Sequence, residues 1–310
     1  MTHSPCVSVI VRTKDRPIQL KNALCSISAQ DYRPLEVVVV NDGGCHLSPL
    51  DLQAVFPDIS VRLIELDTNL GRARAANTGI RNCSGEYICF LDDDDKLQSH
   101  HISALIMYLD GREEKVAYSK VDFVQKKADE DCTQGRLLHT FGRSFDPREL
   151  IIANYIPFIS VLFDAGILKE MMIDEGFELY EDWDLLIRLS QITDFVFVDQ
   201  VTCIYYQHYE NQIAFCSDQS VIQKNTEKLY EKHRDKLPVD KIFQLREMCR
   251  KQGDEVHKLQ QELNDTQKAL SACRSELRAV LGSRIWRVFN SCRRIWRRLL
   301  LLCRSTMQSK

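Results

Sequence analysis

A run of four aspartates, Asp92 to Asp95, directly follows the apolar segment Tyr87–Leu91. Adjacent carboxylates repel one another, and a divalent cation that prefers oxygen ligands, Mg²⁺ or Mn²⁺, would neutralise them. Such an ion usually binds through one or two carboxylates together with substrate phosphates. Most acidic runs are solvated loops. Because this run follows an apolar strand, we instead predict a site for a metal ion and a phosphate.

A glycine and two arginines, Gly71, Arg72 and Arg74, stand at the expected start of a helix. The backbone N–H groups and the dipole of a helix N-terminus attract anions, and arginine adds positive charge. The alternative is a surface helix with ordinary arginines. No Walker motif follows this glycine, and no G-x-G-x-x-G follows the first apolar strand, so the motifs of kinase-like and dinucleotide-binding proteins are missing.

Two acidic residues, Glu181 and Asp182, begin a segment whose apolar residues have helical spacing. Acids in the first turn of a helix are favourable for capping alone. In the functional alternative, one of them is a general base that removes a proton from a hydroxyl. The helix N-terminus would lower the pKa of that base, whereas acidic neighbours and bound phosphates would raise it, and the sequence leaves the balance open.

A histidine, His208, follows the apolar segment 195–206. A histidine in this position either ligates a metal ion or makes a structural hydrogen bond. The local sequence favours the structural role and leaves the other open.

Short apolar runs precede most of these polar groups. Their alternation with helical segments predicts a parallel sheet covered by helices. Polar residues gather at 12–15, 41–42 and 92–95, where three predicted strands end, and ligands bind beyond the carboxyl ends of such strands. The predicted strands are 7–11, 35–40, 61–66, 87–91, 115–124 and 195–206, and the predicted helices are 17–29, 72–82, 181–191 and 218–235.

Taken in order, these segments resemble the glycosyltransferases of family 2, which have the GT-A fold. The resemblance covers residues 7–211, about two-thirds of the chain. Each motif is weak alone, but five in order with suitable gaps are specific. The motifs are Val7–Pro17, Val37–Gly43, Asn69–Gly79, Phe90–Asp95 and Glu181–Trp183.

The resemblance implies a donor site for a nucleoside diphosphate sugar. Thr13 and Asp42 would flank the nucleotide base. The arginine that usually precedes Asn77 is replaced by Ala76, and Arg74 stands two positions earlier, so the resemblance leaves open which arginine contacts the diphosphate. The further implied donor contacts are Asp15, Asn69, Gly71, Arg74, Asn77, Asp92 and Asp93.

The resemblance also implies the metal ligands and the catalytic base. Asp94, with Asp92 and His208, would hold Mn²⁺ or Mg²⁺, and Asp182 would be the base. Glu181 and Trp183 would lie on the acceptor side. The QxxRW motif and the transmembrane helices of processive family members are absent from the sequence, so we expect one sugar to be added each time an acceptor binds.

Composition bounds the setting of this chemistry. The chain has 310 residues and a net charge of −3, so the whole molecule has no electrostatic preference for nucleic acid. Its 12 cysteines are scattered, and the N-terminus lacks the pattern of a signal peptide, which favours a reducing cytosol over a disulfide framework. No apolar run reaches about 18 residues, so no span of a bilayer is expected.

The C-terminal part has a different texture. Apolar residues spaced by three and four over 242–280 predict a coiled coil that could form a homo-oligomer, although a helix packed on the catalytic domain is the alternative. Residues 281–304 carry seven arginines, two tryptophans and no acid. This segment is typical of an amphipathic helix on a membrane surface, and its alternatives are a partner-protein helix and a nucleic-acid contact.

These observations predict an α/β protein of the GT-A type, a Rossmann-like mixed sheet covered by helices, followed by a coiled coil and an amphipathic helix. We expect a nucleotide-sugar-binding half at 1–100, an acceptor-binding half at 101–240, the coiled coil at 241–280 and the membrane-associating tail at 281–310. The expected activity is inverting, metal-dependent transfer of a sugar, from a UDP-sugar to a lipid-linked saccharide, on the cytoplasmic face of a membrane.

Two rival functions stay open. A nucleotidyltransferase on a similar scaffold would carry a glycine-rich loop with lysine or arginine after the first strand, and residues 7–17 contain no glycine. A non-catalytic scaffold would assemble partners through the coiled coil. Intact Asp92, Asp94 and Asp182 argue against the scaffold.

Overall fold

The structure is a computed structural model that describes residues 4–56, 58–126, 135–208 and 218–282. The chain divides into a first unit, residues 1–241, and a second unit, residues 242–310.

A nine-stranded mixed sheet organises the first unit, with the strand order β3-β2-β1-β4-β8-β6-β9-β5 and with β7 paired to β6. The block β3-β2-β1-β4 is parallel throughout, as the alternation of strands and helices predicts, whereas β8, β7 and β5 pair antiparallel to their neighbours. The strands are β1 (Val7–Thr13), β2 (Leu35–Asp42), β3 (Ser60–Leu66), β4 (Tyr87–Asp92), β5 (Lys96–Leu97), β6 (Val116–Lys126), β7 (Arg136–Phe141), β8 (Val161–Asp164) and β9 (Phe195–His208).

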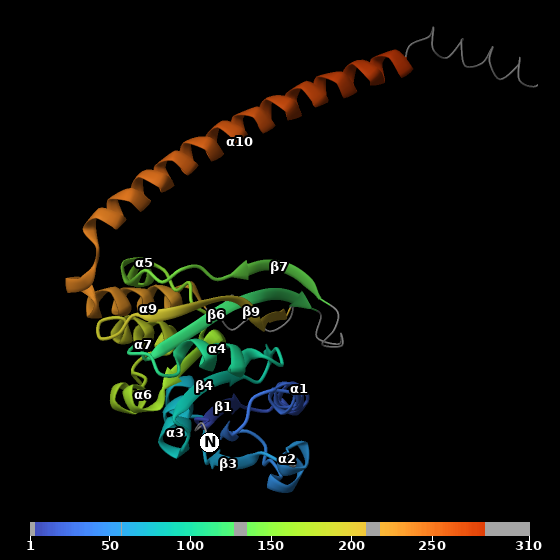
Figure 1. The fold of residues 1–310 in the computed structure, drawn as a ribbon. Helices are drawn as coiled ribbons and strands as arrows, with labels where there is room; N and C mark the ends of the chain where they lie inside the picture. The colour runs from blue at the N-terminus through green and yellow to red at the C-terminus, as the bar shows by residue number, and fades with distance from the viewer. Residues whose placement is uncertain (1–3, 57, 127–134, 209–217, 283–310) are drawn as a thin grey trace, which may run out of the picture. The chain divides into compact units, whose positions relative to one another are not determined.

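Helices cover both faces of this sheet, and Figure 1 shows α1 and α2 on one side of it and α3 and α6 on the other. One core lies between the sheet and α3, α5, α6, α7 and α9, and the second lies between the sheet and α1, α2 and α4. The helices are α1 (Pro17–Ser28), α2 (Pro49–Val55), α3 (Arg72–Asn82), α4 (His101–Leu109), α5 (Pro147–Ile152), α6 (Ala165–Met171), α7 (Glu181–Leu189) and α9 (Gln219–Lys232), with short 3-10 helices at Phe158–Ser160 and Arg234–Lys236.

The register of the parallel block brings the predicted polar groups to one edge. Arg12 pairs with Asp92 and Thr13 pairs with Asn41 across neighbouring strands. Successive side chains of a strand point to opposite faces of the sheet. Residues 10 and 90 belong to the core on the α3 side, and residues 9, 11, 89 and 91 belong to the core on the α1 side. The acidic run therefore sends its carboxylates to both sides of the sheet.

Several elements of the structure were not predicted from the sequence. Helix α4 is buried on almost every side, at Ile102, Leu105 and Leu109 among others, so its residues show no polar face that would mark a helix. Strands β5 and β8 have two and four residues, too few to display an alternating pattern. The predicted strand 195–206 continues to His208, because Gln207 and His208 pair with the end of β6.

The second unit contains most of helix α10 (Val239–Gly282), 44 residues long. Apolar residues of the predicted seam, Val256, Leu259, Leu263 and Leu270, are half exposed along it. The predicted membrane-associating tail lies almost entirely outside the described residues. Within the parts that are described, no helix is both long enough and apolar enough to cross a bilayer.

Candidate active site

Asp92 ends β4 on the α3 side of the sheet, between two arginines. Nε of Arg12 donates a hydrogen bond to Oδ1 of Asp92 at 3.1 Å, and Nη2 of Arg72 lies 3.6 Å from Oδ2. Burial favours the neutral carboxyl, but the charges of the two arginines outweigh it and hold the pKa of Asp92 below its ordinary value. Asp92 is therefore ionised at neutral pH.

Glu181, the first residue of α7, meets the same two arginines. Its Oε1 atom lies 3.5 Å from Nη1 of Arg12 and 3.3 Å from Nε of Arg72, and the residue is only 1% exposed. Neither contact has the geometry of a hydrogen bond, so this buried oxygen has charge partners but no donor among the described residues. Asp92, Glu181, Arg12 and Arg72 together form what we call the arginine cluster.

Asp182 follows Glu181 and is partly exposed beside this cluster. Burial and the neighbouring charge of Glu181 raise its pKa to about 6, although the positive charge of Arg72 and a 2.7 Å hydrogen bond from the Trp183 N–H act in the opposite direction. The balance that the sequence leaves open is thus decided by burial. A carboxylate with this pKa is ionised at pH 7 and is a better proton acceptor than an ordinary aspartate.

A buried network fixes the helix that carries Asp182. Asp184 is fully buried and accepts hydrogen bonds from Nε2 of His233 at 2.9 Å and from Nε of Arg188 at 2.8 Å, and the ammonium of Lys232 lies 2.8 Å away. Burial opposes ionisation, but these partners, His233 first, lower the pKa of Asp184 to about 2. The network ties α7 to the C-terminal end of α9.

Asp93 and Asp94 lie on the α1 side of the sheet. Oγ1 of Thr13 donates to Asp93 at 2.7 Å, and Nη1 of Arg16 donates to Asp93 at 3.1 Å and to Asp94 at 3.0 Å. Burial, together with the charge of Asp94, raises the pKa of Asp93 to about 6, although the hydrogen bond from Thr13 opposes this shift. The acidic run is thus neutralised by different arginines on its two sides.

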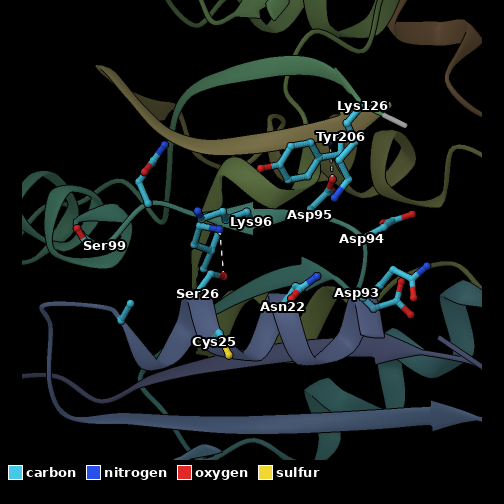
Figure 2. Close-up of a pocket in the computed structure, with 14 residues that line it drawn as sticks. Asn22, Cys25, Ser26, Asp93, Asp94, Asp95, Lys96, Ser99, Lys126 and Tyr206 are labelled. Carbon is cyan, nitrogen blue, oxygen red and sulfur yellow. Dashed lines mark hydrogen bonds between the residues drawn. The ribbon is translucent and has the colours of Figure 1, made fainter. Parts of the chain in front are cut away.

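Asp95 is buried between α1 and the end of β9. Its Oδ1 atom accepts the N–H of Tyr206 at 3.0 Å, whereas Oδ2 is buried and has no hydrogen-bond partner among the described residues. Burial and the charges of Asp94 and Asp92 raise the pKa of Asp95 well above its ordinary value. Asp95 lines a cavity of about 380 Å³, which Figure 2 shows between α1 and the strand that carries Tyr206.

The predicted donor residues of the first two strands surround the loop before α3. Asp42 accepts the N–H groups of Leu70 at 2.7 Å and of Gly71 at 3.0 Å, so it anchors this loop. Asn69 also accepts the N–H of Gly71, at 3.1 Å. Asp15 has a left-handed backbone, with φ 55°, and accepts the N–H of Cys45 at 2.7 Å. Together these contacts shape the strand ends on which a nucleotide base would lie.

Three other predicted residues are engaged elsewhere in the first unit. Nε of Arg74 lies 3.2 Å from Glu175 rather than near the acidic run. The Asn77 amide donates to the carbonyl of Ile173 at 2.8 Å and accepts its N–H at 2.9 Å. The Trp183 indole is buried and donates to a carbonyl of α5. The binding roles of these residues stay predictions, as does that of His208, whose side chain is outside the described residues.

Sequence reasoning assigned no individual role to Arg12, Arg16 or Tyr205, and it named Arg72 only as one of two arginines at the start of a helix. Arg12 is near the end of β1, Arg16 follows that strand, and Arg72 opens α3. Tyr205, near the end of β9, stacks on Phe123 with ring centroids 5.5 Å apart, and burial together with the acidic run raises its pKa. Strand alternation at residues 12 and 92 could have paired Arg12 with Asp92. No local pattern marks Tyr205, and the pattern at the start of α3 does not distinguish Arg72 from Arg74.

The carboxylates suit a hard divalent cation. Among the described residues, no three histidine, cysteine or acidic side chains converge as a complete metal site. Mg²⁺ and Mn²⁺, however, commonly bind through one or two carboxylates and complete their coordination with water and substrate phosphates. Asp92 and Asp94 are each 27% exposed at the strand end and supply oxygen donors of this kind, so they fit such an ion.

Comparisons with known proteins identify curated relatives. The chain is 25% identical over 186 residues to the uncharacterised glycosyltransferase YwdF of Bacillus subtilis. This alignment covers 60% of this chain and 68% of YwdF. It is 28% identical over 198 residues to the succinoglycan biosynthesis protein ExoO of Rhizobium meliloti, over 59% of this chain and 55% of ExoO. A Campylobacter jejuni GalNAc(5)-diNAcBac-PP-undecaprenol beta-1,3-glucosyltransferase is 36% identical over 104 residues, which are 33% of this chain and 34% of that enzyme.

Solved structures share the fold at low sequence identity. The mannosyltransferase PcManGT of Pyrobaculum calidifontis, in complex with GDP-Man and Mn²⁺, is 18% identical and aligns over 76% of this chain and 65% of its own, with a TM-score of 0.54. TarS 1-349 of S. aureus, in complex with UDP-GlcNAc, is 18% identical and aligns over 68% and 61%, with a TM-score of 0.52. These likenesses confirm the GT-A-like mixed sheet that the motifs predict.

The sequence model of glycosyl transferase family 2 matches residues 8–170, which is more than half of the 310 residues of the chain. The match includes β1, the Asp42 strand end, the start of α3 and the acidic run. The chain therefore belongs to family 2 of the glycosyltransferases.

Proposed function

We propose that this chain transfers one sugar at a time, with inversion, from a UDP-sugar to a hydroxyl of a saccharide acceptor. The observation that carries the proposal is the position of Asp182, whose raised pKa suits a general base, directly beside the arginine cluster. Asp182 takes the proton of the acceptor hydroxyl while that hydroxyl attacks the anomeric carbon. Attack from the side opposite the departing nucleotide inverts the configuration of that carbon.

The donor lies across the strand ends in this proposal. Thr13 and Asp42 flank the nucleotide base, and Asp15, Asn69, Gly71 and Asp93 complete its surroundings. Asp94, with Asp92 and His208, would hold Mn²⁺ or Mg²⁺, which supplies positive charge to the departing diphosphate when bound. The Mn²⁺ in the PcManGT complex supports this cofactor, and the UDP-GlcNAc in the TarS complex supports a uridine nucleotide.

We assign the diphosphate contact to Arg72 rather than to Arg74. Arg72 is the first residue of α3, where the helix N-terminus attracts anions, and its side chain is 45% exposed. Its guanidinium lies beside both Asp92 and Glu181, so it faces the predicted metal ligands and the catalytic helix at once. The guanidinium of Arg74 instead pairs with Glu175.

The acceptor is a lipid-linked saccharide of bacterial surface polysaccharide assembly in this proposal. The names of ExoO and of the Campylobacter glucosyltransferase support that class. Residues 281–304 would hold the enzyme on the cytoplasmic face of the membrane through their arginines and tryptophans. The half-exposed apolar seam of α10 would pair with the same helix of another copy as a coiled coil.

A thermal-shift measurement tests the donor class. The protein is heated with UDP, GDP, CDP or dTDP, each with Mn²⁺ and with EDTA. A ligand that binds only the folded state raises the apparent melting temperature by mass action. We expect a metal-dependent rise with UDP. A rise with another nucleotide would revise the donor, and no rise with any of them would favour the non-catalytic scaffold.

A substitution tests the catalytic base. Asp182→Asn should lower kcat by about two to four orders of magnitude, because general-base catalysis contributes this much, while the UDP shift is retained. Asp199→Asn, at an exposed aspartate of β9, is the matched control and should keep full activity. An Asp182→Asn variant as active as this control would remove Asp182 from the mechanism.

A further inference from the structure

Arg16 has no role in the mechanism above, although it is paired with a predicted metal ligand. It follows β1 and is the N-cap residue of α1. Its Nη1 atom donates a hydrogen bond to Oδ1 of Asp93 at 3.1 Å and another to Oδ2 of Asp94 at 3.0 Å. One guanidinium nitrogen therefore bridges two adjacent carboxylates of the acidic run.

This bridge puts a permanent positive charge beside the predicted metal ligand. A guanidinium stays protonated in proteins, so Arg16 offsets the repulsion between the carboxylates of Asp93 and Asp94. Asp94 is a ligand of Mn²⁺ or Mg²⁺ in the proposed function. A cation on Asp94 would repel the guanidinium, whose Nη1 atom lies 3.0 Å from Oδ2 of the same carboxylate. Arg16 and the cation therefore compete for this part of the acidic run.

The bridge is able to open on its Asp94 side. The side chain of Arg16 is 29% exposed and that of Asp94 is 27% exposed, so neither is locked in the core. The side chain of Asp93 is only 5% exposed, and it also accepts a hydrogen bond from Oγ1 of Thr13 at 2.7 Å. When Arg16 turns away, Asp93 would keep one partner and Oδ2 of Asp94 would become available to a metal ion.

A diphosphate would relieve the competition between the two positive charges. Its oxygens ligate a divalent cation and also accept hydrogen bonds from a guanidinium, so it supplies partners for both. The nucleotide and the cation would then each strengthen the binding of the other by the same factor. Because Arg16 weakens the binding of the cation alone, it should set the size of that factor.

We propose that Arg16 is the resident counter-cation of the metal site and keeps Mn²⁺ or Mg²⁺ from binding strongly until the diphosphate of the donor arrives. The inference rests on the proposed function, because the metal site and the nucleotide belong to it. Arg16 acts on the reaction through Asp94, so it is a positioning residue rather than a catalytic one.

Electron paramagnetic resonance on the full chain without nucleotide tests the first half of the proposal. Free Mn²⁺ gives a strong signal in water, and this signal falls when the ion binds. Arg16→Gln removes the charge but keeps a polar side chain, and it should bind Mn²⁺ about tenfold more tightly than the parent does. Arg16→Lys keeps the charge and should bind Mn²⁺ as weakly as the parent. Lys14→Gln is the matched control, because it removes one positive charge from an exposed position of the same loop and should leave the Mn²⁺ affinity unchanged.

Calorimetric titration with UDP, in Mn²⁺ and in EDTA, tests the second half. The ratio of the two UDP affinities is the coupling factor between nucleotide and cation. We expect this ratio to be smaller in Arg16→Gln than in the parent by about fivefold or more, because the site of the variant binds the cation before the nucleotide arrives. Arg16→Lys should keep the ratio of the parent, and the melting temperatures of both variants establish that they are folded.

Three results would overturn the proposal. The first is an Arg16→Gln variant with the Mn²⁺ affinity of the parent. The second is a gain in Mn²⁺ affinity that survives in the double variant Arg16→Gln/Asp94→Asn, since the ion would then be held elsewhere. The third is weaker UDP binding by Arg16→Gln in EDTA with no change in Mn²⁺ affinity, which would make Arg16 a simple contact of the nucleotide.

The outcome is separable from that of the proposed function. If neither the parent nor the variants bind UDP, the donor assignment and the nucleotide-dependent half of the proposal both fail, while a gain in Mn²⁺ affinity in Arg16→Gln would still identify the counter-cation. UDP binding that depends on Mn²⁺ equally in the parent and in Arg16→Gln would leave the donor site standing and remove the role of Arg16.

Discussion

The pH dependence of sugar transfer gives a direct check on Asp182 as the general base. Burial and the charge of Glu181 raise the pKa of Asp182 to about 6. A base acts only when it is ionised. A raised pKa means that the carboxyl group keeps its proton to higher pH. The enzyme should therefore have full activity well above pH 6 and lose activity as the pH falls through about 6.

The size of the effect follows from the ionised fraction. At pH 5 an acid of pKa 6 is ionised to 1/(1 + 10), or about 9%, whereas an aspartate with the ordinary pKa of 3.8 is ionised to about 94%. We therefore expect kcat/KM at pH 5 to be about one-tenth of its value on the plateau above pH 7. An unperturbed base would leave kcat/KM almost unchanged over this interval.

The assay is the initial rate of nucleoside diphosphate release at low donor concentration, because kcat/KM reports the groups of the free enzyme. Asp93 also has a pKa of about 6, so it is the necessary control. In Asp93→Asn the acid limb should keep its position, whatever the activity of that variant. Circular dichroism at pH 5 establishes that the protein stays folded.

Two results would refute the reasoning. A rate that is flat from pH 7.5 to 5 would mean that the base has an ordinary pKa or is another group. Loss of the acid limb in Asp93→Asn would assign the titration to the α1 side of the sheet.

Three further predictions concern the surroundings of the site. Arg72→Ala should lower kcat/KM by about ten- to a hundredfold, which is the contribution of a charged hydrogen bond. It should also move the acid limb of the pH profile to higher pH, because the charge of Arg72 lowers the pKa of Asp182. Arg74→Ala should do neither, and equal losses of kcat/KM in the two variants would contradict the assignment of the diphosphate contact to Arg72. Asp184→Asn should destabilise the fold by about 3 kcal/mol at pH 7, because buried His233 loses its charged partner. The pKa of Asp184 is lowered to about 2, so the stabilisation from its ionised form is present above pH 4 and declines below it. In urea unfolding, the difference in free energy of unfolding between the parent and Asp184→Asn should therefore be about 1 kcal/mol smaller at pH 3 than at pH 7. A free-energy difference that stays constant with pH would contradict the lowered pKa. Deletion of 281–310 should move the protein from the membrane to the soluble fraction with donor hydrolysis retained, and unchanged membrane association would exclude the tail as the anchor.

The parallel half of the fold could be predicted because its sequence signals are local. Strands β1, β2 and β4 are buried on both faces and appear as uninterrupted apolar runs. Helix α3 has the bounds that the sequence predicts, since Gly71 precedes it and Cys83 leaves the helical region. The acidic run then follows at the end of β4, where the parallel topology puts a ligand site.

The arginine cluster could not be predicted in the same way. Arg12 and Arg72 are far apart in the sequence, and they meet Glu181 only because α3 and α7 pack on the same face of the sheet. The resemblance to the family motif places Arg74 among the donor contacts but leaves open which arginine contacts the diphosphate. Which arginine faces the site depends on the rotation of α3 about its axis, which the sequence does not determine.

The alternation of side chains at the strand ends has a consequence for insertions and deletions. Tyr205 and Tyr206 are adjacent, yet the first lies near Asp92 and Arg72 and the second lines the cavity beside Asp95. Asp92 and Asp93 diverge in the same manner. One residue added or removed within β9 would exchange the faces of both tyrosine rings, because a strand has a side-chain period of two. These strand ends should therefore tolerate almost no change in length.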